Sequence, residues 1–158
     1  MRKLPSRKKW TAAFVGGAAV IGTLAAVALG SPGSGFTFTT YAQANLNEAV
    51  HFNSDRVKFQ TKDATIVRTQ KVVIAAGGFS GWHHHPGVII VSVQSGSVTV
   101  EDSHCTSQTY GAGQVFVEAG DDPLQVASAG GATEYATQVA PQVAPPVFRN
   151  EDAPPPCA

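Results

Sequence analysis

Apolar and polar side chains alternate through most of the chain between residues 55 and 140. Short runs of this kind, separated by Gly, Pro and Asp, predict strands over 56–60, 63–76, 88–94, 97–101, 115–118, 124–128 and 133–139. No run in this range has the 3.6-residue period of an amphipathic helix. Closely spaced short strands with such turns are typical of a sandwich or barrel. The pattern therefore predicts an all-β domain.

Glycines suggest where this chain changes direction. We expect a bend at Gly77-Gly78 and a tight hairpin turn at Ser95-Gly96, because glycine adopts the backbone angles that such turns need. Residues 42–52 fit either a short helix or an extended lead-in, and 102–114 reads as a polar loop.

The N-terminal 30 residues have a different composition. Five basic residues and no acid occupy positions 1–10, and no charge follows until after Gly30. A basic start followed by an apolar stretch is typical of an export signal, but the stretch is also long enough for a membrane anchor helix. We therefore expect a signal peptide or anchor at 1–30, a linker or lead-in at 31–54, a barrel at 55–140 and a Pro-rich tail at 141–158. Either alternative places the barrel outside the cytoplasm, secreted or anchored to the outer face of the membrane.

Charge excludes some partners. Without residues 1–30, six of the 11 basic residues remain against 11 acidic ones, so the net charge is near −5. Nucleic acids and anionic membrane surfaces need basic patches. We expect no nucleic-acid partner, and membrane contact only through the N-terminal segment.

Two cysteines, Cys105 and Cys157, are present. In an exported protein such a pair is most simply a disulfide. The bridge would fasten the tail to the domain and, by closing a loop of roughly 50 residues, contribute about 4 kcal/mol in the chain-entropy account.

Three consecutive histidines, at positions 83 to 85, precede the most apolar predicted strand. Alternate residues of a strand share a face, so His83 and His85 point together and His84 points away, to the surface. If the alternation continues, Ile89, Val91 and Val93 lie on the face of His83 and His85. Imidazole is the commonest metal-ligating side chain, which makes this pair a candidate half of a metal site.

The spacing Gly77-x5-His83-x-His85, followed by an apolar strand and a glycine, resembles the first motif of the cupins. Residues 113–120 resemble the second motif more loosely. The resemblance covers about 56–140 and implies a single jelly-roll β-barrel. The N-terminal segment and composition also resemble those of secreted actinobacterial cupin-domain proteins of unassigned function.

Two ligand positions of these motifs hold residues that cannot bind a metal. The acidic ligand of the first motif falls at Ile89 or Ile90, and the histidine of the second falls near Pro123 or Leu124. Glu118 replaces the motif proline. A third ligand would have to come from elsewhere, and the candidates are His51, His104, Glu118 and Gln125.

These departures favour an exported, non-catalytic barrel with a degenerate metal site, which binds a small apolar ligand in a pocket lined by Ile89, Val91 and Leu124 or has a structural role. One alternative is a metal-dependent cupin enzyme, an oxygenase or isomerase, with one divalent transition metal on His83 and His85. Another is a cell-surface module that binds a partner protein. A homodimer is compatible with each of these functions.

Overall fold

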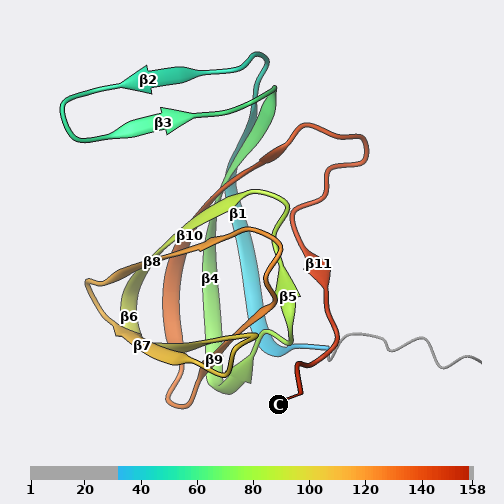
Figure 1. Cartoon of the computed structure of the whole chain (residues 1–158). Coiled ribbons are helices and arrows are strands. Elements are labelled where there is room, and N and C mark those ends of the chain that lie inside the picture. Colours follow the sequence, from blue (N-terminus) through green and yellow to red (C-terminus); the bar gives the residue numbers. More distant parts are fainter. Residues whose placement is uncertain (1–31, 157–158) are drawn as a thin grey trace, which may run out of the picture.

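The computed structural model describes residues 32–156, and no helix occurs among them. The strands are β1 (Ser34–Leu46), β2 (His51–Asn53), β3 (Lys58–Gln60), β4 (Thr65–Phe79), β5 (His83–His84), β6 (Val88–Asp102), β7 (Ser107–Gly111), β8 (Val115–Ala119), β9 (Leu124–Ser128), β10 (Ala132–Pro141) and β11 (Asn150–Glu151). All pairings are antiparallel. The all-β barrel expected from the sequence is confirmed (Figure 1).

One large sheet closes on itself to form the barrel. Its strand order is β1-β4-β10-β6-β9-β5-β11, with β7 and β8 also paired to β6. β4 pairs both with β10 and, near Gly78, with β9, so β4, β10, β6 and β9 form a closed ring of paired strands. This ring surrounds an interior into which alternate side chains of β4, β6, β8 and β10 point.

The hairpin turn expected at Ser95-Gly96 is wrong. β6 continues from Val88 to Asp102, and its first part pairs with β8 and β10, whereas its second part pairs with β7 and β9. Gly96 has a φ of 74°, and a Cβ placed there would lie 2.1 Å from the carbonyl oxygen of Gly131. Glycine therefore bends one long strand around a corner of the barrel, where a close neighbouring backbone leaves no room for a side chain.

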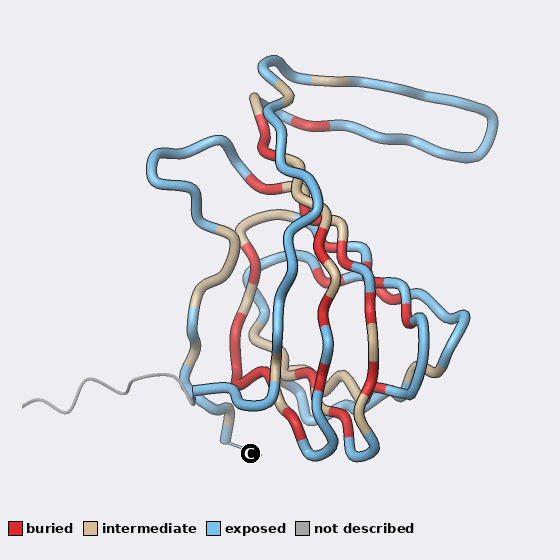
Figure 2. The backbone as a smooth tube through the Cα atoms, turned by 180° about the vertical axis from the view of Figure 1, so that it is seen from behind, coloured by how far each residue is buried: buried red, intermediate tan, exposed pale blue. Residues whose placement is uncertain are grey.

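The core follows the two-residue alternation. Buried and exposed residues alternate through the first part of β6 and through β8, and Figure 2 shows buried stretches interrupted by intermediate or exposed ones along the barrel strands. The buried apolar cluster consists of Val72, Ile74, Ile89, Val91, Val93, Val98, Phe116, Val126, Ala132 and Ala136. The prediction that Ile89, Val91 and Val93 share one inward face is confirmed.

Segments expected to be irregular also contribute strands. The expected linker at 31–54 contains β1, which pairs with β4 from Ser34 to Leu46. The expected loop at 102–114 contains β7. β2 and β3 form a separate two-stranded hairpin that projects beyond the barrel (Figure 1).

The tail differs most from expectation. Residues 148–152, here called the C-terminal segment, include β11, which pairs with β5 through Asn150 to His84 and Glu151 to His83. The backbone N–H of Asp152 also donates to the carbonyl of Trp82 (2.9 Å). Pairing to the histidine strand therefore contributes to ordering this segment.

Two sequence expectations involve residues outside the described range. The export signal or anchor helix at 1–30 lies there, and so does Cys157, so the Cys105–Cys157 bridge stays a prediction. Among residues 32–156, no helix is long and apolar enough to cross a membrane.

Candidate metal centre

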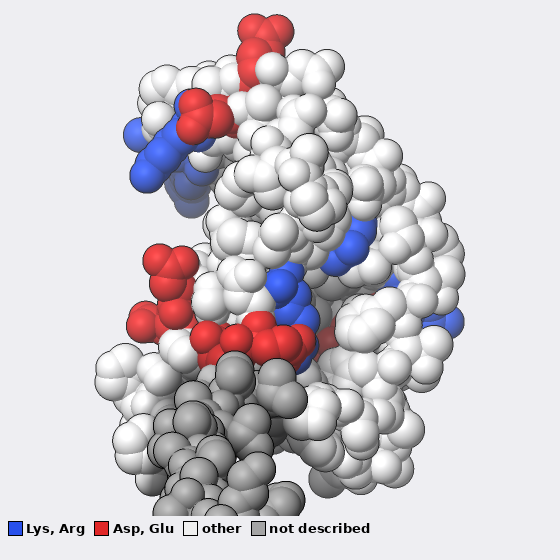
Figure 3. All heavy atoms as spheres, turned by 90° about the vertical axis from the view of Figure 1, so that its right-hand side faces the viewer, with Lys and Arg blue, Asp and Glu red and all other residues white. Residues whose placement is uncertain are grey.

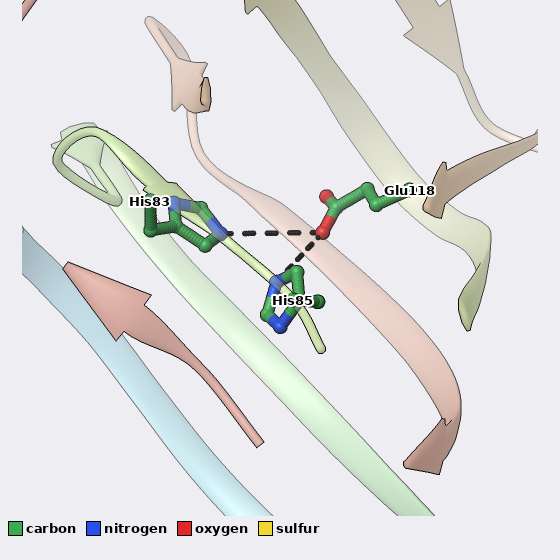
Figure 4. Close-up of side chains that lie close together, drawn as sticks. All are labelled: His83, His85 and Glu118. Atoms are coloured by element: carbon green, nitrogen blue, oxygen red, sulfur yellow. Dashed lines mark ion pairs between the residues drawn. The ribbon is translucent and has the colours of Figure 1, made fainter. Parts of the chain in front are cut away.

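His83, His85 and Glu118 come together inside the barrel (Figure 4). One ligand atom from each lies within 4.8 Å of the others. Glu118 Oε2 is 3.0 Å from His85 Nε2 and 4.0 Å from His83 Nε2. All three side chains are buried. This is a compact donor set that a single metal ion could share.

The two histidines reach the interior through the alternation of the β5 strand. His83 and His85 are buried, whereas His84 faces outward and its Nδ1 lies 2.7 Å from Asp152 Oδ2. The predicted division of the three histidines between two faces is therefore confirmed, although the C-terminal segment half-covers His84. Trp82 is buried and lies outside the residues that line the cavity.

Glu118 lies on β8, a strand that pairs with β6. On β8 the buried residues are Phe116 and Glu118, and Glu118 pairs directly with Ile89 of β6. Directly paired residues point to the same face of a sheet, so the carboxylate enters the barrel beside Ile89. The carboxylate that the cupin motif places at 89 or 90 is thus supplied from the adjacent strand. Glu118, one of the four candidates for a third ligand, therefore completes the group begun by the two histidines.

Backbone carbonyls determine which ring nitrogen of each histidine carries hydrogen. His83 Nδ1 lies 2.9 Å from the carbonyl oxygen of Gly81, and His85 Nδ1 lies 2.5 Å from that of Phe148. A carbonyl only accepts, so each Nδ1 must be the donor. In a neutral ring the Nε2 atom is then an acceptor. In the neutral form of each ring, the Nε2 atom on the side of Glu118 is therefore free to bind a metal ion.

This arrangement calls for a positive charge. His85 Nε2 and Glu118 Oε2 lie 3.0 Å apart, and either a proton or a metal ion between them makes this contact favourable. Metal-binding histidines characteristically donate their other ring N–H to a carbonyl or carboxylate, as both do here. Two histidines and one carboxylate are also the donor set of non-haem iron(II) sites. The residues fit a divalent transition metal.

Burial keeps one ligand ready to bind. Desolvation lowers the pKa of His83 to about 4, and the nearby positive charge of Arg149 acts in the same direction. Metal ligands must be deprotonated to bind. At neutral pH His83 is therefore already in its binding form.

A cavity of about 360 Å³ adjoins the three ligands. Its apolar wall includes Ile89 and Val91, as predicted. Leu124 does not line it; this residue pairs with His83 and packs against the core instead. Figure 3 shows the side of the molecule that faces right in Figure 1. Basic side chains lie within a hollow there, with acidic side chains beside them.

A second buried carboxyl lines the same cavity. Glu134 is 4% exposed, and its Oε1 has no hydrogen-bond partner among the described residues. Burial, followed by the negative charge of Glu118, raises the pKa of Glu134 to about 7. An unpaired buried oxygen that faces a cavity is available to a ligand that donates a hydrogen bond.

Of the four residues considered as a third ligand, the structure brings only Glu118 to the site. His51 and His104 are exposed, on β2 and in a loop, and Gln125 lies outside the cavity lining. The alternation of residues 115–119 places Phe116 and Glu118 on one face, which was the available signal. The local sequence does not show that this face is the inner one, because that depends on the pairing of Glu118 with Ile89 of a distant strand.

Comparisons with known proteins gave matches to solved structures alone. A scan against protein-family models found no match, and neither did a search of the curated proteins. Among solved structures, the chain is similar to a salicylate 1,2-dioxygenase from Pseudaminobacter salicylatoxidans (15% identity, TM-score 0.42, covering 45% of this chain and 20% of that one). It is also similar to an oxalate oxidase (25%, TM-score 0.41, covering 45% and 40%).

A conserved Streptococcus pyogenes protein of unknown function is similar over more of its length (17% identity, TM-score 0.46, covering 62% of this chain and 79% of that one). The match to the dioxygenase spans a fifth of that enzyme. All three TM-scores are below 0.5, so these likenesses do not define what this chain does. The barrel and its paired histidines agree with the cupin resemblance of the sequence.

Proposed function

We propose that this protein is a metal-dependent enzyme of the cupin type, which holds one divalent transition metal on His83, His85 and Glu118. The observation that carries the proposal is the convergence of three buried side chains, His83, His85 and Glu118, with one potential ligand atom of each within 4.8 Å of the others. Catalytic metal sites typically combine three protein ligands with exchangeable positions. A non-catalytic barrel was expected because the two remaining ligand positions of the motifs hold apolar residues, and Glu118 favours the metal-dependent alternative because it supplies a third ligand from another position.

Oxygenase chemistry is the reaction class we propose. A site of two histidines and one carboxylate with open positions is typical of non-haem iron(II) oxygenases. When bound, such an ion supplies redox chemistry and coordination positions for small molecules. The adjoining cavity of about 360 Å³ has the size of a small-molecule site.

The chain's own residues have three tasks in this proposal. The carbonyls of Gly81 and Phe148 hold the two imidazoles in one tautomer and orientation. The apolar wall around Ile89 and Val91 excludes water. Glu134 Oε1 offers a hydrogen-bond acceptor to a hydroxyl or amine of the substrate.

Metal content tests this proposal. We expect about one Fe, Mn, Co, Ni, Cu or Zn ion per chain, measured by mass spectrometry of protein purified without a His tag and reconstituted anaerobically. Replacement of His83 and His85 by Ala, or Glu118→Gln alone, should lower the metal affinity at least tenfold, measured by competition with a chelator of known affinity, because the loss of a supporting contact alone already costs ten- to a hundredfold. His104→Ala, an exposed histidine, is the matched control and should bind like the wild type.

Failure has a clear signature. A wild-type content well below one ion per chain after reconstitution, or an unchanged metal affinity in the Glu118→Gln variant, refutes the metal centre. Full occupancy without any turnover of small molecules and oxygen would instead favour the alternative of a binding protein.

We also propose that the protein acts outside the cytoplasm, on the evidence of its N-terminal sequence. Cys105 and Cys157 would then form a disulfide. Thiol counting by mass spectrometry under non-reducing conditions tests the bridge: exported protein should contain no alkylatable thiol, and two thiols would refute it.

A further inference from the structure

A single row of paired residues links the metal ligand Glu118 to an arginine. Glu118 of β8 pairs with Ile89 of β6, Ile89 pairs with Gln138 of β10, and Gln138 pairs with Arg68 of β4. Directly paired residues point to the same face, so all four side chains enter the barrel at one level. All four line the cavity. Arg68 thus lies three strands away from the metal ligand along this row and faces the same cavity.

The guanidinium of Arg68 is held in a fixed position. Its Nε and Nη2 donate to Gln138 Oε1, the first over 2.7 Å. Its central carbon lies 3.5 Å from the centre of the Phe148 ring, a cation–π stack. The carbonyl of Phe148 in turn accepts from His85 Nδ1. One residue of the C-terminal segment therefore orients both a metal ligand and Arg68.

These contacts leave the Nη1 edge of the Arg68 guanidinium without a partner among the described residues. Guanidinium has five N–H donors, and Gln138 engages two of them. Among the described residues, no acceptor bonds to Nη1 of Arg68. An oriented pair of N–H groups at a cavity wall matches the geometry of a carboxylate.

The charge of Arg68 is also not compensated. No described acid forms an ion pair with it, whereas Arg149, the other arginine of the cavity, is bound by both oxygens of Glu151. Burial lowers the pKa of Arg68, but a guanidinium stays charged at neutral pH. A half-buried cation without a counterion is costly, so a bound anion would relieve that cost.

The rest of the cavity is suited to an apolar body. Phe36 and Phe38 line it from β1, and Val72, Ile89 and Val91 line it from β4 and β6. A phosphate or sulfate would gain nothing from these residues. The lining therefore favours an organic acid over a mineral anion.

We propose that Arg68 binds the carboxylate of a small organic acid, whose apolar part lies in the cavity between Arg68 and the three metal ligands. This names the substrate class of the proposed enzyme and rests on that function for the reaction, although the binding itself does not require turnover. Arg68 directs the carboxylate to one wall, and the remainder of the molecule then faces His83, His85 and Glu118.

Calorimetric titration with two matched probe pairs tests this: benzoate against benzamide, and hexanoate against hexanamide. Each pair has the same size and differs in charge. We expect at least one acid to bind wild-type, metal-loaded protein tenfold or more tightly than its amide. Arg68→Gln should abolish this preference, and Arg68→Lys should retain part of it, because a point charge replaces the two-pronged fork. Arg56→Gln removes an exposed charge on the β2–β3 hairpin and should change nothing.

Three results would overturn the proposal: neither acid binds, the acids bind no better than their amides, or the preference survives in Arg68→Gln. If Arg68→Gln does not fold, as judged by circular dichroism, an Arg68→Lys variant with wild-type acid affinity and selectivity is the overturning result. Metal content measured on the same samples keeps the two proposals apart. Arg68 is not a ligand, so its variants should retain the wild-type metal content, and titration of the metal-free protein shows whether acid selectivity persists if the metal centre fails.

Discussion

The C-terminal segment and the β2–β3 hairpin are both short additions to the barrel, but they contact very different partners (Figure 1). The segment accepts a hydrogen bond from His85, binds His84 and, through Arg149, donates to the carbonyl of Ser80. The hairpin bonds mainly within itself, for example from Ser54 N to the carbonyl of Val57. A short strand flanked by prolines can thus make more contacts with the site than a regular hairpin does.

The largest expected effect comes from removing residues 148–158. This deletes the carbonyl that orients His85 and the ring that stacks on Arg68. We expect metal affinity to fall ten- to a hundredfold, the usual loss when a supporting contact of a ligand is removed. Competition with a chelator of known affinity measures it.

Two controls sharpen this contrast. Replacing residues 50–61 by a short Gly-Ser linker removes the hairpin and should leave metal affinity within about twofold. Cys157→Ser in the full chain separates the loss of the segment from the loss of the expected disulfide. Equal metal affinities in the truncated and the hairpin-deleted chains would show that the contacts of the segment have no role in binding.

The next effect concerns pH. Glu134 has a folded pKa of about 7 against an ordinary value of 4.5, so the folded state holds this proton more tightly than the unfolded chain. Its contribution to stability is therefore complete below about pH 4.5 and is lost as pH rises through 7. Glu134→Gln removes this loss. Between pH 5 and 8 the metal-free variant should gain stability relative to wild type, on the order of 3 kcal/mol.

Urea unfolding at a series of pH values measures this gain. His83, with its lowered pKa, acts oppositely: its neutral burial costs stability as pH falls from about 6.5 towards 4. Comparing variant with wild type at each pH cancels that contribution. Asp55→Asn, an exposed acid on the hairpin, is the matched control and should give a flat difference. A flat difference for Glu134→Gln as well would contradict the raised pKa.

The smallest effect is expected on the hairpin itself. Phe52 is 67% exposed although it pairs with Phe59. Phe52→Ala should change the free energy of unfolding by less than about 0.5 kcal/mol, as surface substitutions usually do. The matched change Phe116→Ala, in the barrel core, should cost about 3–5 kcal/mol. A cost above 1 kcal/mol at Phe52 would reveal packing that the exposed surface does not suggest.

The sequence predicted those features that depend on local periodicity. The alternation of side chains along a strand was sufficient to predict that His83 and His85 share the face of Ile89 and that His84 points outward. Glu118 could be placed beside Phe116 on one face, but its meeting with the histidines depends on the register between β8 and β6. Register is set by the packing of distant strands, so no local pattern contains it.

Glycine and proline positions predicted turns and irregular segments less reliably than alternation predicted strand faces. Gly96 suggested a turn because its backbone freedom serves a hairpin and a strand bend equally well, and the contact with Gly131 selects the bend. Prolines before and after the C-terminal segment suggested an irregular tail. Pairing with β5 is a non-local contact, and it overrides the composition of the flanking residues.

The bond between His85 and Phe148 also has a consequence for kinetics. Its partners are 63 residues apart, whereas 33 residues separate His85 from Glu118. Contacts between distant residues form slowly, because a longer loop must close first. We expect the three ligands to assemble before the C-terminal segment docks over them. Docking of the segment would then lower the dissociation rate of the metal and have little influence on its association rate.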